Sequence, residues 1–473
     1  MKIKFSNKST WYFYFFVAGT FLIVVSPNLF SHGMFVDGLL YSTLAKNMAN
    51  GIGTFWTPHY TATLATNFHG HPPLAFGLQS IFFRIFGENR LVEKLYSLLM
   101  ILIAAIIISK IWKTLYYKYA WFPLLLWLFT PVVNWACVNN MIENTLTIFI
   151  LLSVLFYLKS EQNKKHLFIF LSGIMLSFGF LTKGFVAFFP WTFPLIRWFM
   201  LRQKTFRIVL IETVELVMYT VTPLILLIVL IPEARVSLKT YVEVQVIYSL
   251  KNVVTVDTRF YILIKLIEEL IPAFILCFSL IVWAKFRKFP FIVLKRNYKQ
   301  ASVFIMLGLS GVLPIMISLK QSGFYILPTY PIFAIAFSSL LYPLLETLFS
   351  NIHYNSKGFL FFKIIAIVLF ILGITFSLFF SNKYNRDKNK LKDIYIIISE
   401  LPSGSIINIP PEMFSDWSLH GYFARYKNIS LDPDLKNKRE YLLIKREIYS
   451  DTLERNYEVV PLNTSVYKLL KRK

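Results

Sequence analysis

Long apolar runs recur along the 473 residues of the chain, and their length leaves few choices of fold. A helix needs about 20 predominantly apolar residues to cross a bilayer core, where each backbone polar group must find its partner within the protein. The sequence is therefore predicted to form a polytopic α-helical membrane protein. We predict eleven spans, near residues 11–29, 92–112, 119–137, 142–158, 166–182, 185–201, 208–231, 262–284, 302–319, 324–343 and 360–380.

The charged residues are few and are unevenly placed. They make up 16% of the chain, whereas soluble proteins carry about a quarter. The formal net charge of +24 comes from Lys and Arg in short loops between apolar runs, where they act as topology signals and contacts for anionic lipid. We therefore expect membrane lipids as partners, and no nucleic acid. The basic loops fall on one side of the predicted spans, at residues 1–8, 110–118, 159–166, 202–207 and 285–299.

The positive-inside rule assigns that basic side to the cytoplasm, so residues 30–91 and the tail face the opposite side. This predicts a multi-pass membrane protein whose first long loop and tail lie outside the cytoplasm. The tail, residues 382–473, is richer in charge, Pro and Asn, with short β-prone runs such as "SIINI" and "SVYKLL". We predict a small C-terminal α/β domain there, after a transmembrane domain of residues 1–381.

The first outer loop carries polar groups that a simple connection would not need. "DGLLYSTLAKNMA" has helical apolar spacing and predicts an amphipathic helix on the membrane surface, with Asp37 at its start. "HPPLAFGLQSIFFRIFG" predicts a second interfacial helix with prolines in its first turn. The ordinary explanation for Asp37 is a helix cap, and His69 and His71 alone fit interfacial polar residues.

Further ionisable residues are predicted on the same face. Glu143 stands at the mouth of the span near 142–158, where a buried charge is costly and usually functional. Lys183 lies between two apolar runs. Lys320 follows a span in "SLKQSGFYILPTYP", shortly before Tyr325. Each residue has a structural explanation, and their shared side favours a functional site.

This set of residue types suits transfer of a sugar from a lipid phosphate. Lysine is a good point-charge partner for phosphate, and a carboxylate can act as general base for an attacking hydroxyl or amine. Because phosphate is already a good leaving group, no protein acid is required, in contrast to glycoside hydrolysis. No cofactor is firmly predicted. A divalent cation held by His69, His71 and Glu143 is the alternative use of these side chains, although their spacing is not typical of a metal site.

The sequence resembles the bacterial membrane glycosyltransferases of the GT-C class, particularly the aminoarabinose-transferase and protein-mannosyltransferase-like group. The segments that carry the resemblance are "VDGLLYSTLAKNMA", "HGHPPLAFGLQSIFFRIFG", "NNMIENTLTIFILLSVLFYL", "GIMLSFGFLTKGFVAFFP" and "KQSGFYILPTYP". It implies a polyprenyl (in bacteria undecaprenyl) phosphate sugar donor and inverting transfer on the periplasmic face. It also implies that Asp37 and Glu143 are catalytic, with His71, Lys183, Lys320 and Tyr325 as candidates for binding the donor phosphate.

The chain departs from the family pattern at three positions. His71 replaces the Lys that many relatives have before the Pro pair, and Glu143 replaces an Asp. Asp37 is followed by Gly38, whereas relatives with protein acceptors often show two adjacent acids. This favours a lipid or glycan acceptor. The alternatives are a transporter or flippase of lipid-linked sugars, a glycan polymerase or ligase, and a structural membrane protein. The flippase is the main competitor, but we find no internal repeats or matched broken helices of the transporter kind.

Overall fold

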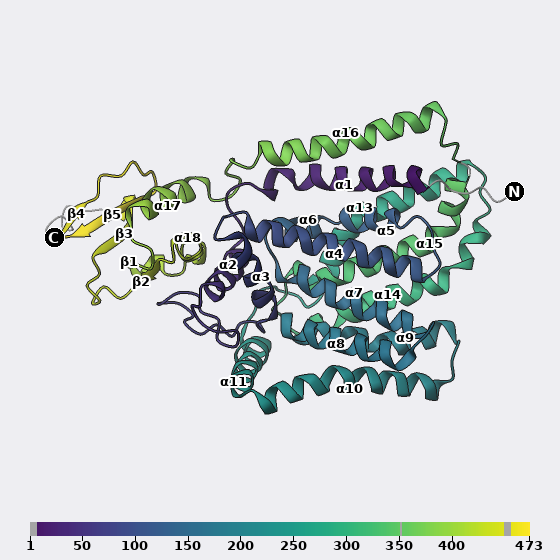
Figure 1. Ribbon diagram of the computed structural model, residues 1–473, viewed down its shortest axis with the longest axis horizontal. Helices are drawn as coiled ribbons and strands as arrows, with labels where there is room; N and C mark the ends of the chain where they lie inside the picture. The colour runs from purple at the N-terminus through teal and green to yellow at the C-terminus, as the bar shows by residue number, and fades with distance from the viewer. Residues whose placement is uncertain (1–6, 351, 449–455) are drawn as a thin grey trace.

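The computed structural model describes residues 7–350, 352–448 and 456–473, and it shows a helical bundle joined at one end to a small sheet domain (Figure 1). Nine helical segments in the described residues are long and apolar enough to cross a membrane. They are α1 (Asn7–Leu29), α4 (Val92–Thr114), α7 (Ile142–Ser160), α8 (Lys165–Lys183), α10 (Phe206–Leu230), α13 (Tyr261–Phe286), α14 (Tyr298–Val312) with η4 (Leu313–Ile317), η5 (Gly323–Thr329) with α15 (Tyr330–Ser350), and α16 (Lys357–Phe379).

The other two predicted spans are shorter or bent. α5 (Trp121–Leu128) and α6 (Pro131–Val138) form a pair with an angle of 76° between them, which counts as a tenth span if it crosses as one unit. Pro131 explains the break, because proline disfavours helical backbone at the residue before it. Residues 185–201 form the 3₁₀ helix η1 (Phe185–Thr192) followed by α9 (Phe193–Leu201), a shorter apolar segment. The prediction of a polytopic helical protein is confirmed.

Two helices of the bundle approach each other closely at positions occupied by glycine. α1 and α16 pack side by side (Figure 1), and a Cβ at Gly19 would clash with the backbone of Phe370. A Cβ at Gly373 of α16 would likewise clash with the side chain of Leu22. Without a hydrophobic driving force between helices in lipid, such close contacts of small residues stabilise their association.

Both predicted helices of the first outer loop are present, as α2 (Val36–Ala49) and α3 (Leu74–Phe86). α3 keeps an exposed apolar side at Ile81 and Ile85, as an interfacial helix requires. α2 differs from a helix on the membrane surface, because every residue from Leu39 to Met48 except Leu40 is buried. It lies between α3 and α18 (Trp417–Lys427) of the C-terminal domain.

Two buried basic residues join the C-terminal domain to α2 and α4. Lys46 of α2 donates to the carbonyl oxygens of Ala424 and Arg425 at 2.9 Å each, near the end of α18. Arg425 in turn forms a buried ion pair with Glu93 of α4 at 2.7 Å. The C-terminal domain is therefore attached to the adjoining end of the bundle by polar contacts that are shielded from water.

The C-terminal domain contains α17 (Lys388–Glu400), η6 (Pro411–Met413), α18, η7 (Arg446–Ile448) and one five-stranded sheet, in keeping with the α/β prediction. β1 (Ile406–Asn408) pairs in parallel with β2 (Ser430–Asp432) and β3 (Tyr441–Lys445). β5 (Tyr467–Arg472) pairs antiparallel with β3 and β4 (Tyr457–Val459), which gives the order β2-β1-β3-β5-β4. The register places Ile407 beside Leu431 and Leu443 beside Leu469, all buried in the domain core.

Candidate active site

The end of the bundle next to the C-terminal domain holds the start of α2, where Asp37 lies in the first helical turn. Asp37 is not the helix cap, because the N-cap position is Phe35 and no side chain caps the helix. The Phe35 N–H donates to Asn139 Oδ1 at 2.8 Å, and a Cβ at Gly38 would clash with the Asn139 carbonyl oxygen. α2 therefore begins directly against the turn that precedes α7, the helix that carries Glu143.

Glu143 and Lys183 form a buried ion pair between α7 and α8. The Glu143 side chain is 0% exposed and that of Lys183 is 6% exposed. Lys183 Nζ donates to Glu143 Oε1, while Oε2 is buried without a hydrogen-bond partner among the described residues.

Lys183 is the last residue of α8, because Gly184 follows with φ +80° and ends the helix. The hydroxyl of Tyr241 donates to the Lys183 carbonyl at 3.2 Å and fixes this helix end. Tyr241 opens the π-helix η2 (Tyr241–Ile247), which lies between α11 (Pro232–Thr240) and α12 (Tyr248–Asn252).

The loop before η5 adds a second lysine, and η5 itself adds an aromatic wall. The ammonium of Lys183 lies 4.7 Å from the ring centroid of Tyr325 and 5.4 Å from that of Phe324. Lys320 Nζ donates to Ser249 Oγ at 2.9 Å and forms no ion pair with any carboxylate in the described part of the chain. Gln321 holds this loop in place, since it is 2% exposed and its side-chain amide donates to the Ser318 carbonyl at 2.8 Å.

His71 completes the group from the loop before α3. Its Nε2 lies 3.2 Å from the Tyr41 hydroxyl, and its Nδ1 is buried without a partner among the residues described. Burial, followed by the charges of Lys183 and Lys320, holds the pKa of His71 well below its usual range. His71 is therefore a neutral hydrogen-bonding group at pH 7.

Asp37 shares the electrostatic field of these groups. Burial, reinforced by the charge of Glu143, raises the pKa of Asp37 to about 6, while Lys183 and Lys320 oppose the shift. Burial, more than any other cause, also lowers the pKa of Lys320, against the attraction of Asp37. Among the residues that the structure describes, none forms a hydrogen bond or ion pair with the Asp37 carboxylate. It is thus a carboxylate available to a substrate proton near neutral pH.

The structure brings together six of the seven residues singled out from the sequence: Asp37, His71, Glu143, Lys183, Lys320 and Tyr325. His69 points elsewhere, with its Nδ1 3.2 Å from Ser237 Oγ of α11. No group of three or more His, Cys, Asp and Glu side chains in the described ranges is arranged to hold a metal ion. The alternative set of His69, His71 and Glu143 is accordingly not assembled.

Sequence reasoning missed three residues that shape this site. Tyr41 lies one turn after Asp37 in α2, and this spacing is the signal that could have paired it with the site. Phe324 precedes Tyr325 and forms the other half of the aromatic wall beside Lys183. Gln321 follows Lys320 directly, but no local pattern distinguishes a buried loop glutamine from an exposed one.

Comparison with known proteins identifies the architecture. The fold matches ArnT from Cupriavidus metallidurans bound to undecaprenyl phosphate, with a TM-score of 0.68 and 16% identity over 97% of both chains. The chain has a GT-C fold. The same protein in its apo state gives a TM-score of 0.66 at 14% identity over 98% of both chains. The apo oligosaccharyltransferase of Archaeoglobus fulgidus gives 0.56 at 12% identity, over 94% of this chain and 70% of that one.

A sequence-family model also matches part of the chain. Residues 70–234 match the family model described as dolichyl-phosphate-mannose-protein mannosyltransferase. This range runs from the loop containing His71 through Glu143 and Lys183. No curated protein matches the sequence significantly. The resemblance to GT-C glycosyltransferases that the sequence motifs indicated is confirmed, and the chain is a multi-pass membrane protein.

Proposed function

We propose that this GT-C protein is a glycosyltransferase that moves a sugar from a polyprenyl-phosphate donor to a lipid or glycan acceptor. The observation that carries the proposal is the unpaired Asp37 carboxylate beside the buried Glu143–Lys183 ion pair and Lys320. A free base and fixed cations in one desolvated site are what attack on a sugar linked to phosphate needs.

The donor is a sugar on a polyprenyl monophosphate, undecaprenyl phosphate in a bacterium. Two comparisons support this choice: the family model is named for dolichyl-phosphate-mannose, and the matching ArnT structure is bound to undecaprenyl phosphate. Lys320 is the cation that no carboxylate in the described residues neutralises, so it is the first contact for the donor phosphate. Neutral His71 supports it, because Nδ1–H can donate to a phosphate oxygen when Nε2 accepts from Tyr41.

The reaction is an inverting displacement at the anomeric carbon. Asp37 accepts the proton of the attacking acceptor group as the new glycosidic bond forms. The bond from the anomeric carbon to phosphate oxygen breaks, and its electron pair leaves with the polyprenyl phosphate. Lys320 and Lys183 stabilise the departing charge, and Glu143 fixes the position of Lys183 beside the ring of Tyr325.

The active face is periplasmic in this proposal, in a bacterial inner membrane. The basic loops lie at the bundle end opposite the C-terminal domain, and the positive-inside rule assigns that end to the cytoplasm (Figure 1). Gly38 supports a lipid or glycan acceptor over a protein, because its lack of a side chain is required for contact with Asn139 and no second acid can stand there.

A transfer assay in membranes tests the function. Wild type, Asp37→Asn and Glu143→Gln are compared with polyprenyl-monophosphate and polyprenyl-diphosphate sugars and a mixed acceptor extract. Transfer from the monophosphate donor by wild type, abolished in Asp37→Asn with donor binding retained, is expected. Asp257→Asn, the same change on an exposed outer loop, should remain active and serves as the control. Full activity in Asp37→Asn would exclude Asp37 as the base of the reaction. Donor movement across the bilayer without transfer would favour a flippase.

A further inference from the structure

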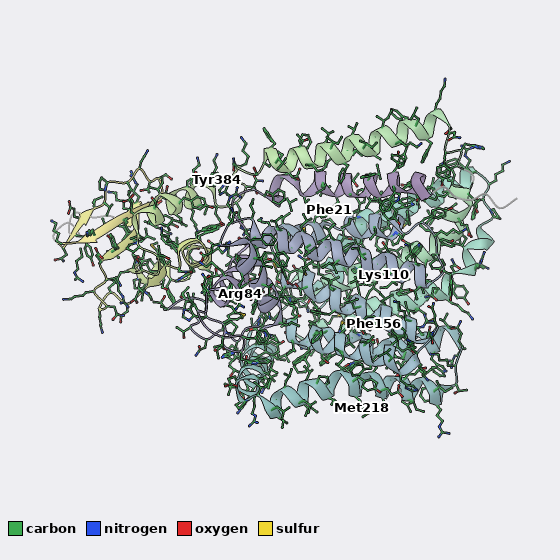
Figure 2. The ribbon with its side chains drawn as sticks, in the orientation of Figure 1. Phe21, Arg84, Lys110, Phe156, Met218 and Tyr384 are labelled. Carbon is green, nitrogen blue, oxygen red and sulfur yellow. The ribbon has the colours of Figure 1, made fainter. Side chains whose placement is uncertain are left out.

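A cavity lies beside the candidate active site, and none of the catalytic or phosphate-binding residues proposed above lines it. It has a volume of about 320 Å³, within the range of small-molecule sites. Its wall comes from the outer ends of α1, α4 and α6 and from the segment between α16 and α17. Figure 2 places Tyr384 of that segment at the neck between the helices and the C-terminal domain.

The cavity wall is cationic. It includes Lys94 and Arg386, and no acidic side chain is among the described residues that line it. Lys94 is 4% exposed, and its ammonium donates to the carbonyls of Asn28 at 3.1 Å and Val138 at 2.6 Å. These bonds use two of its three N–H groups. The nearest carboxylate to Arg386 is that of Asp387, outside the lining, at 3.7 Å from Nε.

Amide side chains make up much of the remaining polar surface. Asn28, Asn134, Asn139 and Asn385 all line the cavity. The Asn134 Oδ1 atom is buried and has no partner among the residues described, although its Nδ2 donates to the Leu128 carbonyl at 3.1 Å. A buried acceptor without a partner is costly, so the site favours a ligand that brings hydroxyl groups as well as negative charge.

The position of the cavity relates it to the membrane surface. Val24 and Val25 of α1 line one side, and the polar residues 385–386 line another, so the mouth lies where apolar helix gives way to polar chain. Amphiphiles place their head groups at this boundary. A lipid with an anionic, hydroxylated head group therefore matches both the lining and the location.

The cavity shares a wall with the candidate active site. Asn139 lines it and accepts the N–H of Phe35, two residues before Asp37. Trp135, also in the lining, stacks on Phe324 with ring centroids 5.5 Å apart, and the Phe324 ring centroid lies 5.4 Å from the Lys183 ammonium. The guanidinium of Arg386 lies 5.4 Å from the Phe35 ring centroid.

We propose that this cavity binds the phosphate-bearing, hydroxylated head group of a membrane lipid and serves as the acceptor site. The role as acceptor site rests on the proposed transferase function, whereas binding of the head group does not. Lys94 and Arg386 contact the phosphate, and Asn134 accepts a hydroxyl hydrogen. The occupant then lies against the turn that carries Asp37, across Phe35 and Trp135 from Lys183.

Lipid titration of the full-length protein in detergent, followed by native mass spectrometry, tests the binding. The probes are phosphatidylglycerol, which has both phosphate and free hydroxyls, phosphatidylcholine, which has no net charge or hydroxyl, neutral glucosyl diacylglycerol, and inorganic phosphate. Wild type should bind phosphatidylglycerol about tenfold more tightly than either other lipid, as expected for one charge-assisted contact. Arg386→Glu should remove this preference, and Arg386→Lys should retain part of it.

Lys383→Glu is the matched control, because it makes the same charge change on an exposed residue of the same segment outside the lining. If Lys383→Glu and Arg386→Glu lose the preference for phosphatidylglycerol equally, the binding reflects general surface charge and the proposed site is overturned. If inorganic phosphate displaces phosphatidylglycerol at equal concentration, the claim that the ligand is a lipid head group is overturned. If the wild-type protein shows Arg386-dependent lipid binding but transfers no sugar, the lipid site is supported and the transferase proposal fails. If transfer occurs and Arg386→Glu leaves the acceptor KM unchanged, the acceptor role is overturned.

Discussion

The Glu143–Lys183 ion pair allows a quantitative test of how this site is held together. Both side chains are almost completely removed from solvent, at 0% and 6% exposed, so water screens the pair little. Glu143→Gln keeps the shape of the side chain and removes the charge that neutralises Lys183. Breaking a buried pair from one side leaves an uncompensated charge and costs about 3–5 kcal/mol. We expect a loss of this size in the free energy of unfolding.

A double variant separates charge from packing. In Glu143→Gln/Lys183→Met the ammonium is also gone, and the methionine can pack against the rings of Tyr325 and Phe324. Most of the lost stability should therefore return, which gives a double-mutant cycle with a large coupling energy. SDS titration of the purified protein in mixed micelles measures all four proteins of the cycle.

The exposed pair Lys265–Glu268 on α13 provides the control. Its side chains are 33% and 48% exposed, and pairs of this kind contribute about 0–1 kcal/mol. Glu268→Gln should therefore change the unfolding free energy little. A loss below about 1 kcal/mol in Glu143→Gln, or a double variant no more stable than the single one, would refute the argument from buried charge.

Three further predictions concern the same site. Transfer should decline about tenfold per pH unit below the Asp37 pKa of about 6, because the base must be deprotonated, and a flat profile from pH 4.5 to 8 would contradict this. Lys320→Ala should raise the donor KM about tenfold or more with less effect on kcat, whereas Lys251→Ala on the exposed surface should not; equal donor KM values would mean that other groups hold the phosphate. Gly184→Ala should destabilise the protein by more than about 1 kcal/mol, since φ is +80° and the new Cβ would meet the Tyr241 hydroxyl. Tyr241→Phe in that background should recover part of the loss in thermal unfolding, and no recovery would exclude the clash.

The spanning helices could be predicted from the sequence because apolar length is a local property. The strands at "SIINI", "REYLLIKRE", "YEVVPL" and "SVYKLL" were likewise recognisable from β-prone composition. β2 at Ser430–Asp432 was not, because three residues beside a helix carry too short a pattern and depend on pairing with β1 for their conformation.

The residues of the candidate site could be predicted as a set on one membrane face. Which of them form ion pairs with each other could not. Glu143 and Lys183 are 40 residues apart, and nothing local indicates that α7 and α8 bring them into contact. For α2, polar residues such as Ser42 and Lys46 suggested an exposed face, yet both are buried, and Lys46 is bonded to the end of α18. Burial of this kind depends on a segment almost 380 residues later, which periodicity cannot reveal.

The attachment of α2 to the C-terminal domain has a consequence for engineering this protein. A chimera that exchanges residues 382–473 with those of another GT-C protein would remove the two carbonyls that hold Lys46 and the guanidinium that pairs with Glu93. It would leave Lys46 without its partners on α2, the helix that carries Asp37 in its first turn, and Glu93 without its partner on α4. Domain exchange intended to alter acceptor choice therefore has to transfer α18 together with complementary residues at positions 46 and 93.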